Sequence, residues 1–183
     1  MTALTDRPGT VAVPGRASEP RRGAAARYLL AGLRIALGWI FLWAFLDKMF
    51  GFGFATETEG AVVNGGSPTE GFLAFGTTGP FAGFYQDIAG TTWADVLFMA
   101  GLAGIGIALI AGIGIRVAAV AGGLLLVMMW TAALPPENNP FMDDHLIYAG
   151  LLAVLALVNA GDTLGLGKMW ARTPLVHRLP WLK

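Results

Sequence analysis

The chain has 183 residues, of which 55% are hydrophobic and 13% charged, and its formal net charge is zero. Soluble domains carry about 25% charged residues, so this balance excludes an ordinary soluble domain and favours a membrane protein. Cysteine is absent and only two histidines occur. Disulfides, thiolate metal sites and iron–sulfur clusters on this chain are therefore excluded.

Residues 1–27 form a polar arm rich in proline and arginine, a composition typical of a disordered tail. Its charge is modest and it adjoins an apolar stretch. We therefore interpret it as a flank that sets the orientation of that stretch, and we expect no nucleic-acid binding.

Four apolar stretches follow the arm, and we predict an all-α bundle of four transmembrane helices. About 20 helical residues cross a hydrocarbon core that is about 30 Å thick. The first stretch is interrupted by Arg34, and the last is short unless it continues past Asp162. The predicted spans are 28–48, 94–115, 117–134 and 145–164, which makes 28–167 the transmembrane domain and 168–183 a basic tail.

The segment 51–92 between the first two spans is long enough to hold structure of its own. Ser67–Glu70 and Thr92–Asp95 both have the order of a capping box, which marks the start of a helix. One apolar helical face is formed by Phe81, Phe84, Tyr85 and Ile88. We expect this outer loop to carry short interfacial helices.

The sign of the charge alternates from loop to loop. The arm, the hinge at Arg116 and the tail are basic, whereas 51–92 and 135–144 are acidic. This positive-inside pattern predicts that both termini lie in the cytoplasm.

The second span contains small residues at four-residue spacing, namely Ala100, Gly104, Ala108 and Gly112. Such a face lets helix backbones approach closely, so we expect Gly104 and Ala108 to contact another helix. Packing inside the bundle and homodimer formation both stay open.

Two basic residues of the first span are candidates for a site. Arg34 lies about 10 Å into the membrane from Arg27, where a charge costs about 2.5–3.5 kcal/mol and normally faces the bundle interior. Lys48 follows on nearly the same face. The alternatives are that Arg34 extends to the inner headgroups and that Lys48 forms an ion pair at the membrane edge.

The third candidate is the cluster Asp143, Asp144 and His145 at the start of the last span, with Tyr148 on the face of His145. An imidazole beside carboxylates suits proton exchange with a small redox molecule. The alternative is that a carboxylate caps the helix. Because His145 and His177 belong to opposite membrane faces, we expect this chain alone to bind neither haem nor a metal.

Short segments across residues 28–172 resemble the DoxX/DoxD family of small bacterial membrane proteins. They are Leu33-Arg34-Ile35 with Gly38, Phe41-Leu42-Trp43, Asp47-Lys48, Gly71-Phe72-Leu73, Gly112-Ile113-Gly114-Ile115-Arg116, Asn139-Pro140-Phe141 and Asp144-His145-Leu146-Ile147-Tyr148. The resemblance implies a four-helix bundle in the inner (plasma) membrane of a bacterial cell. One branch is described as the membrane subunit of a thiosulfate:quinone oxidoreductase, and another as a membrane partner in oxidative-stress complexes.

Two functional hypotheses follow. In the first, the chain is a quinone-linked oxidoreductase subunit with Lys48, Asp144 and His145 as catalytic groups. The quinone would then lie against Arg34, Trp39, Phe41, Trp43, Phe45 and Tyr148. Electron transfer would be direct or would use a cofactor on a partner. The acidic outer side would repel thiosulfate, which puts that substrate in question.

In the second hypothesis, the chain is a non-catalytic scaffold or accessory subunit. It would dock other membrane or extracytoplasmic subunits of a respiratory or oxidative-stress complex. The absence of cysteine favours this hypothesis, whereas Arg34 and His145 favour the first.

Overall fold

The computed structural model describes the backbone of residues 19–183 and the side chains from residue 23 onward. This part of the chain is all-helical, as expected from the sequence. The long helices are α1 (Glu19–Phe50), α4 (Thr92–Ala111), α5 (Ile115–Ala132) and α6 (Asp144–Leu157). The short ones are η1 (Thr58–Gly60), η2 (Val62–Asn64), α2 (Glu70–Phe75), α3 (Ala82–Ile88), η3 (Ala160–Asp162), α7 (Gly167–Trp170), α8 (Pro174–Arg178) and η4 (Pro180–Leu182).

Three of the long helices are apolar and long enough to cross a membrane: Gly23–Phe50 of α1, all of α4 and all of α5. The protein is therefore a membrane protein. Helix α6 has 14 residues, which span about 21 Å and fall short of a full hydrocarbon core. It ends before the predicted residue 164 because Asn159 adopts a left-handed backbone conformation with a φ of 49°.

Helix α1 begins at Glu19, earlier than the predicted start of the first span. Part of the predicted disordered arm is thus helical, whereas residues 1–18 lie outside the described part of the chain. The run Ala24-Ala25-Ala26-Arg27 explains the difference, since alanine and arginine are among the strongest helix formers.

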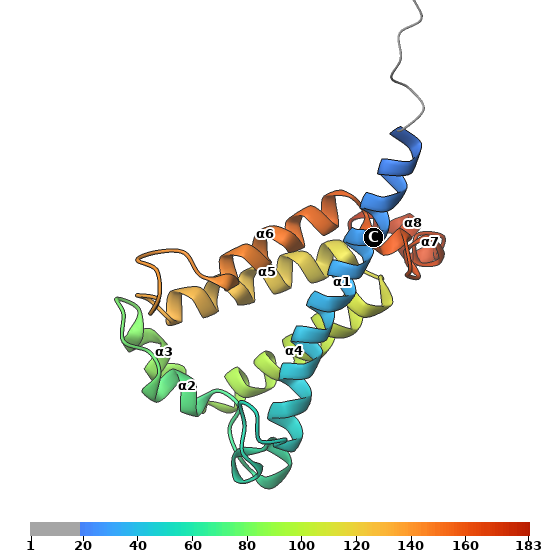
Figure 1. Cartoon of the computed structure of the whole chain (residues 1–183). Coiled ribbons are helices and arrows are strands. Elements are labelled where there is room, and N and C mark those ends of the chain that lie inside the picture. The colour runs from blue at the N-terminus through green and yellow to red at the C-terminus, as the bar shows by residue number, and fades with distance from the viewer. Residues whose placement is uncertain (1–18) are drawn as a thin grey trace, which may run out of the picture.

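The long helices form two pairs, α1 with α4 and α5 with α6, and Figure 1 shows them arranged as a V. The pairs converge beside α7 and α8, at what we call the narrow end. They diverge toward the wide end, where α2 and α3 lie between the two arms of the V. Gly112 and Gly114 make the tight α4–α5 turn because both adopt positive φ, at 73° and 58°.

All four long helices contribute to one hydrophobic core. Its larger members are Leu37 and Phe41 of α1, Met99, Leu102, Ile105 and Leu109 of α4, Leu126 of α5, and Leu152 and Leu155 of α6.

Hydrogen bonds between side chains and backbone hold the outer loop in place. Ser67 Oγ accepts from the Glu70 backbone N–H at 3.1 Å, so the first expected cap is present. Asp95 instead accepts hydrogen bonds from the hydroxyls of Ser67 and Thr69, at 2.8 and 2.6 Å. The second predicted capping box is therefore not formed, since the N-cap of α4 is Thr91 and has no side-chain cap bond. Asp95 ties the loop to α4 in its place.

Helix α3 is fixed to the wide end of α5 through Tyr85. This side chain is buried, and its hydroxyl donates to the Met128 carbonyl oxygen at 2.9 Å. Phe81 and Phe84, predicted to share its face, are exposed. Only part of the predicted apolar face therefore packs against the bundle.

The closest approach between α1 and α4 involves Gly38 and Gly106. A Cβ atom on Gly106 would lie 2.7 Å from the backbone nitrogen of Leu42, so no larger residue fits there. A Cβ atom on Gly104 would have nothing within 4 Å, and this residue is exposed. The two glycines differ because residues two apart lie about 200° apart around a helix. Gly104 therefore does not form the expected close contact with another helix. Gly106 forms the close contact between α4 and α1.

We predict that Gly106→Leu destabilises the protein by about 2 kcal/mol or more, because overpacking would push α4 away from α1. Gly104→Leu is the matched control, since it adds the same side chain to the same helix in open space. Thermal unfolding of both variants in one detergent tests this. Equal melting temperatures would contradict the observed helix contact.

Candidate functional site

Arg34 is the most deeply buried charged residue among those described, with 0% of its surface exposed. Its Nη1 donates to the carbonyl oxygens of Leu109 and, at 3.2 Å, of Ile110. Its Nη2 donates to those of Thr163 at 3.3 Å and Leu164 at 2.8 Å. The side chain therefore joins α1 to the end of α4 and to the chain after η3.

These partners explain how a charge is accommodated inside the bundle. The last carbonyl groups of a helix lack intrahelical partners and carry the negative end of the helix dipole, which attracts a cation. Gly112 and Gly165 leave room for the guanidinium, since a Cβ atom on either would lie 2.6 or 3.1 Å from it. Arg34 faces the interior, as its cost predicted, but backbone carbonyls occupy both of its terminal nitrogens.

Lys48 lies at the other end of the same face of α1. It is partly buried, and its Nζ lies 5.9 Å from the centre of the Phe98 ring on α4, a cation–π contact. Among the described residues it forms no ion pair. The membrane-edge ion pair considered as the alternative is thus not found in this part of the chain.

Asp47 has a role that the sequence did not reveal. Its carboxylate is buried and accepts from the backbone N–H groups of Ala55 at 3.0 Å and Phe54 at 3.4 Å. It thereby fixes the first turn of the outer loop. An acidic residue four positions before the glycine-containing segment that starts at Gly51 was the available signal, because such segments expose backbone N–H groups.

The aromatic residues predicted to line a quinone slot lie on different sides of α1. Phe41 is buried in the core and Phe45 packs against it. Trp39 is exposed, and the ring of Trp43 stacks on Phe52 of the outer loop at 5.7 Å. The four rings therefore do not form one slot.

His145 and Asp143 form a close pair at the start of α6. Nδ1 of His145 lies 2.8 Å from Asp143 Oδ2 and 3.5 Å from an oxygen of Asp144. Asp143 Oδ1 also accepts from the Leu146 backbone N–H at 3.4 Å, which caps α6. The interpretation as a helix cap is confirmed, whereas proton exchange by His145 stays a prediction. Tyr148, one turn further along, packs against the hydrophobic core.

The same cluster supplies the donor atoms that a divalent cation uses. One ligand atom from each of Asp143, Asp144 and His145 lies within 4.8 Å of the other two. The helix cap and the imidazole contact account for these residues without an ion.

A cavity of about 620 Å³ opens beside this cluster, between the end of α2 and the loop from α5 to α6. It is lined by Phe72, Gly76, Thr78, Ala133, Pro135, Pro136, Glu137, Asn138, Asn139, Met142, Asp143 and Asp144. Three of these residues are acidic and none is basic. The cavity therefore suits a ligand or segment that combines positive charge with apolar surface.

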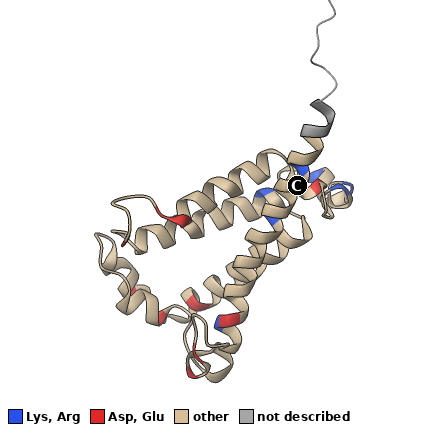
Figure 2. Cartoon of the chain, viewed as in Figure 1, with Lys and Arg blue, Asp and Glu red and all other residues tan. Residues whose placement is uncertain are grey.

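The candidate residues are therefore distributed over three places. Arg34 lies near the narrow end, since it donates to the last carbonyl groups of α4. The end of α1, which carries Lys48, and the start of α6, which carries His145, lie on separate arms of the V (Figure 2). No residue of α1 lines the large cavity. The large cavity is lined by none of Arg34, Lys48 and His145, so it does not join them.

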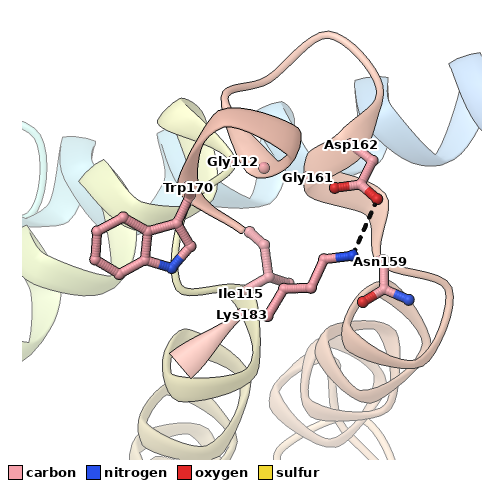
Figure 3. A pocket seen from close by; sticks show the side chains of 8 residues that line it. Gly112, Ile115, Asn159, Gly161, Asp162, Trp170 and Lys183 are labelled. Atoms are coloured by element: carbon pink, nitrogen blue, oxygen red, sulfur yellow. Dashed lines mark hydrogen bonds and ion pairs between the residues drawn. The ribbon is translucent and has the colours of Figure 1, made fainter. Parts of the chain in front are cut away.

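A second, much smaller cavity lies at the narrow end (Figure 3). Its volume of about 10 Å³ suits a single water molecule. Lys183 reaches across it, and its Nζ lies 3.3 Å from Asp162. This site closes the narrow end of the fold and has no space for an organic ligand.

We predict that Arg34→Leu lowers the unfolding free energy by about 3 kcal/mol or more, because several buried carbonyl groups lose their donor. Arg27→Leu removes an exposed arginine two turns earlier on the same helix and is the control. Thermal unfolding of the purified variants measures the difference. If the two variants were equally stable, the hydrogen bonds of Arg34 would contribute nothing to the fold.

Comparisons with protein-family models, with curated proteins and with solved structures found no match to this chain. The function therefore has to be argued from the geometry. That geometry consists of a buried arginine bonded to backbone, a lysine above an aromatic ring, and a histidine–carboxylate pair beside an acidic cavity.

Proposed function

We propose that this protein is a membrane accessory subunit that docks a larger complex at its wide end, and that it does not catalyse a reaction by itself. The observation that carries the proposal is the separation of its candidate catalytic groups. Catalytic groups must reach the same substrate with reacting atoms about 3–3.5 Å apart, whereas the end of α1, which carries Lys48, and the start of α6, which carries His145, lie on different arms of the V.

The docking surface is the outer loop together with the large cavity. Phe75 in α2 is 82% exposed, and Phe54, Phe81 and Phe84 are exposed as well. Exposed apolar patches of this kind mark sites of interaction with proteins or membranes. The adjoining cavity adds negative charge, which favours an extracytoplasmic partner with a basic, partly apolar segment.

The proposed topology has four spans, with α6 and the turn after it as the last. Helix α6 packs along α5, itself long enough to cross the membrane. Apart from the cation at the end of α1, basic side chains lie toward the narrow end, and acidic ones lie mainly toward the wide end (Figure 2). This distribution favours a cytoplasmic narrow end in a bacterial inner membrane, and it agrees with the resemblance to the DoxX/DoxD family.

A second candidate function is the quinone-linked oxidoreductase subunit. The observation that favours it is the close His145–Asp143 pair beside a cavity of about 620 Å³. That volume lies in the range of small-molecule sites, about 300–1,000 Å³. The imidazole would exchange the proton there, and the electrons would require a cofactor on a partner.

The topology is tested with reporter fusions after Lys183 and between Gly65 and Gly66. We expect opposite signals, with the C-terminal fusion cytoplasmic and the loop fusion on the outer side. Identical signals at both positions would exclude an arrangement with four spans.

Two variants expressed in the native membrane, Phe75→Asp and His145→Ala, distinguish the docking function from the redox function. For a docking subunit, Phe75→Asp removes the large assembly from a native gel, whereas His145→Ala leaves assembly and quinone-linked turnover unchanged. For a redox subunit, His145→Ala abolishes turnover while assembly persists, an outcome that would overturn the docking proposal.

A further inference from the structure

The C-terminal segment, residues 163–183, folds against the narrow end of the bundle (Figure 1). The Trp170 indole N–H donates to the Leu182 carbonyl oxygen at 2.7 Å, which closes the segment into a compact unit. Arg116, in the first turn of α5, donates to the carbonyl oxygens of Lys183 and Pro180, at 3.1 and 3.2 Å. The segment is thus held at the ends of the membrane helices.

This segment is purely basic. It contains no aspartate or glutamate, and three of its basic side chains, those of Lys168, Arg172 and Arg178, are exposed. None of these three forms an ion pair among the described residues, in contrast to Lys183, which lies 3.3 Å from Asp162. The fold therefore presents three uncompensated positive charges at its narrow end.

Large apolar side chains are exposed on the same segment. Trp181 is 60% exposed and Met169 is 66% exposed, and Leu175 and Leu179 are exposed as well. Tryptophan beside aliphatic and basic residues is typical of a segment that lies in the headgroup region of a bilayer. A segment that bound only nucleic acid or solvent would have no use for this apolar surface.

We infer that residues 163–183 form a binding surface for anionic phospholipids of the leaflet at the narrow end. The three bases contact the headgroup phosphates, while Trp181 and its apolar neighbours enter the boundary with the acyl chains. Stable binding to a membrane surface requires two contributions, apolar insertion and a basic patch, and this segment has both. The inference goes beyond the docking function and depends on neither of the two candidate functions.

The absence of cysteine allows a direct test with one introduced label. The full chain carrying Leu175→Cys, labelled with an environment-sensitive fluorophore, is placed in nanodiscs of phosphatidylcholine alone or mixed with phosphatidylglycerol. We expect blue-shifted emission only with the anionic lipid and a return to the aqueous spectrum at high salt, since salt screens such contacts. Asn138→Cys, on the acidic side of the protein, is the control and should not respond.

Charge variants of the labelled protein identify the contact. Each base near an anionic surface contributes about a fivefold gain in binding. The triple variant Lys168→Gln, Arg172→Gln, Arg178→Gln should therefore weaken binding roughly a hundredfold, whereas Lys168→Arg, Arg172→Lys, Arg178→Lys retains it. The salt titration needs no charge variant, so it remains decisive if the glutamine variant fails to fold.

Equal emission at position 175 in both lipid mixtures would overturn the inference. An unchanged response in the glutamine variant would overturn it equally. Because the nanodisc presents the same lipids on both faces, neither result depends on the topology or on a partner protein.

Discussion

The buried guanidinium of Arg34 is the interaction on which the rest of the structure depends. It lies in the first long helix, yet its hydrogen-bond partners are the last carbonyls of α4 and those of Thr163 and Leu164. In a membrane interior, an unsatisfied carbonyl or an unpaired charge costs several kcal/mol. The guanidinium and the carbonyl groups therefore stabilise each other. Their hydrogen bonds hold α1, the end of α4 and the chain at residues 163–164 together at the narrow end.

The V shape follows from this constraint. Near the narrow end the helices are joined by Arg34, by the glycine turn between α4 and α5, and by the C-terminal segment. Toward the wide end the two pairs separate, and the outer loop connects them. Tyr85 of α3 bonds to Met128 of α5, and Thr69 of the loop bonds to Asp95 of α4. Function is accordingly proposed at the wide end, where surface is exposed, and lipid contact at the narrow end, where basic residues gather.

The same constraint changes how the charged residues are interpreted. A buried arginine in a membrane helix is ordinarily a reason to propose a ligand site. Here the terminal nitrogens of Arg34 donate to backbone carbonyls, so its burial is explained by the fold itself. His145 differs, because its imidazole pairs with the carboxylates of Asp143 and Asp144, and both of these residues line an open cavity.

The sequence by itself determined the membrane class, the helical content and the positions of the long helices, because hydropathy and length are properties of each segment alone. It also indicated the inward face of Arg34 and the cap at Asp143, which depend on spacing along one helix. Only the tertiary structure decided that Trp39 and Phe41 point to different surroundings, that Gly106 rather than Gly104 forms the close contact, and that Lys48 and His145 lie apart. These outcomes depend on how helices cross, and the partners of Arg34 lie 75 to 130 residues away along the chain, beyond the reach of any local pattern.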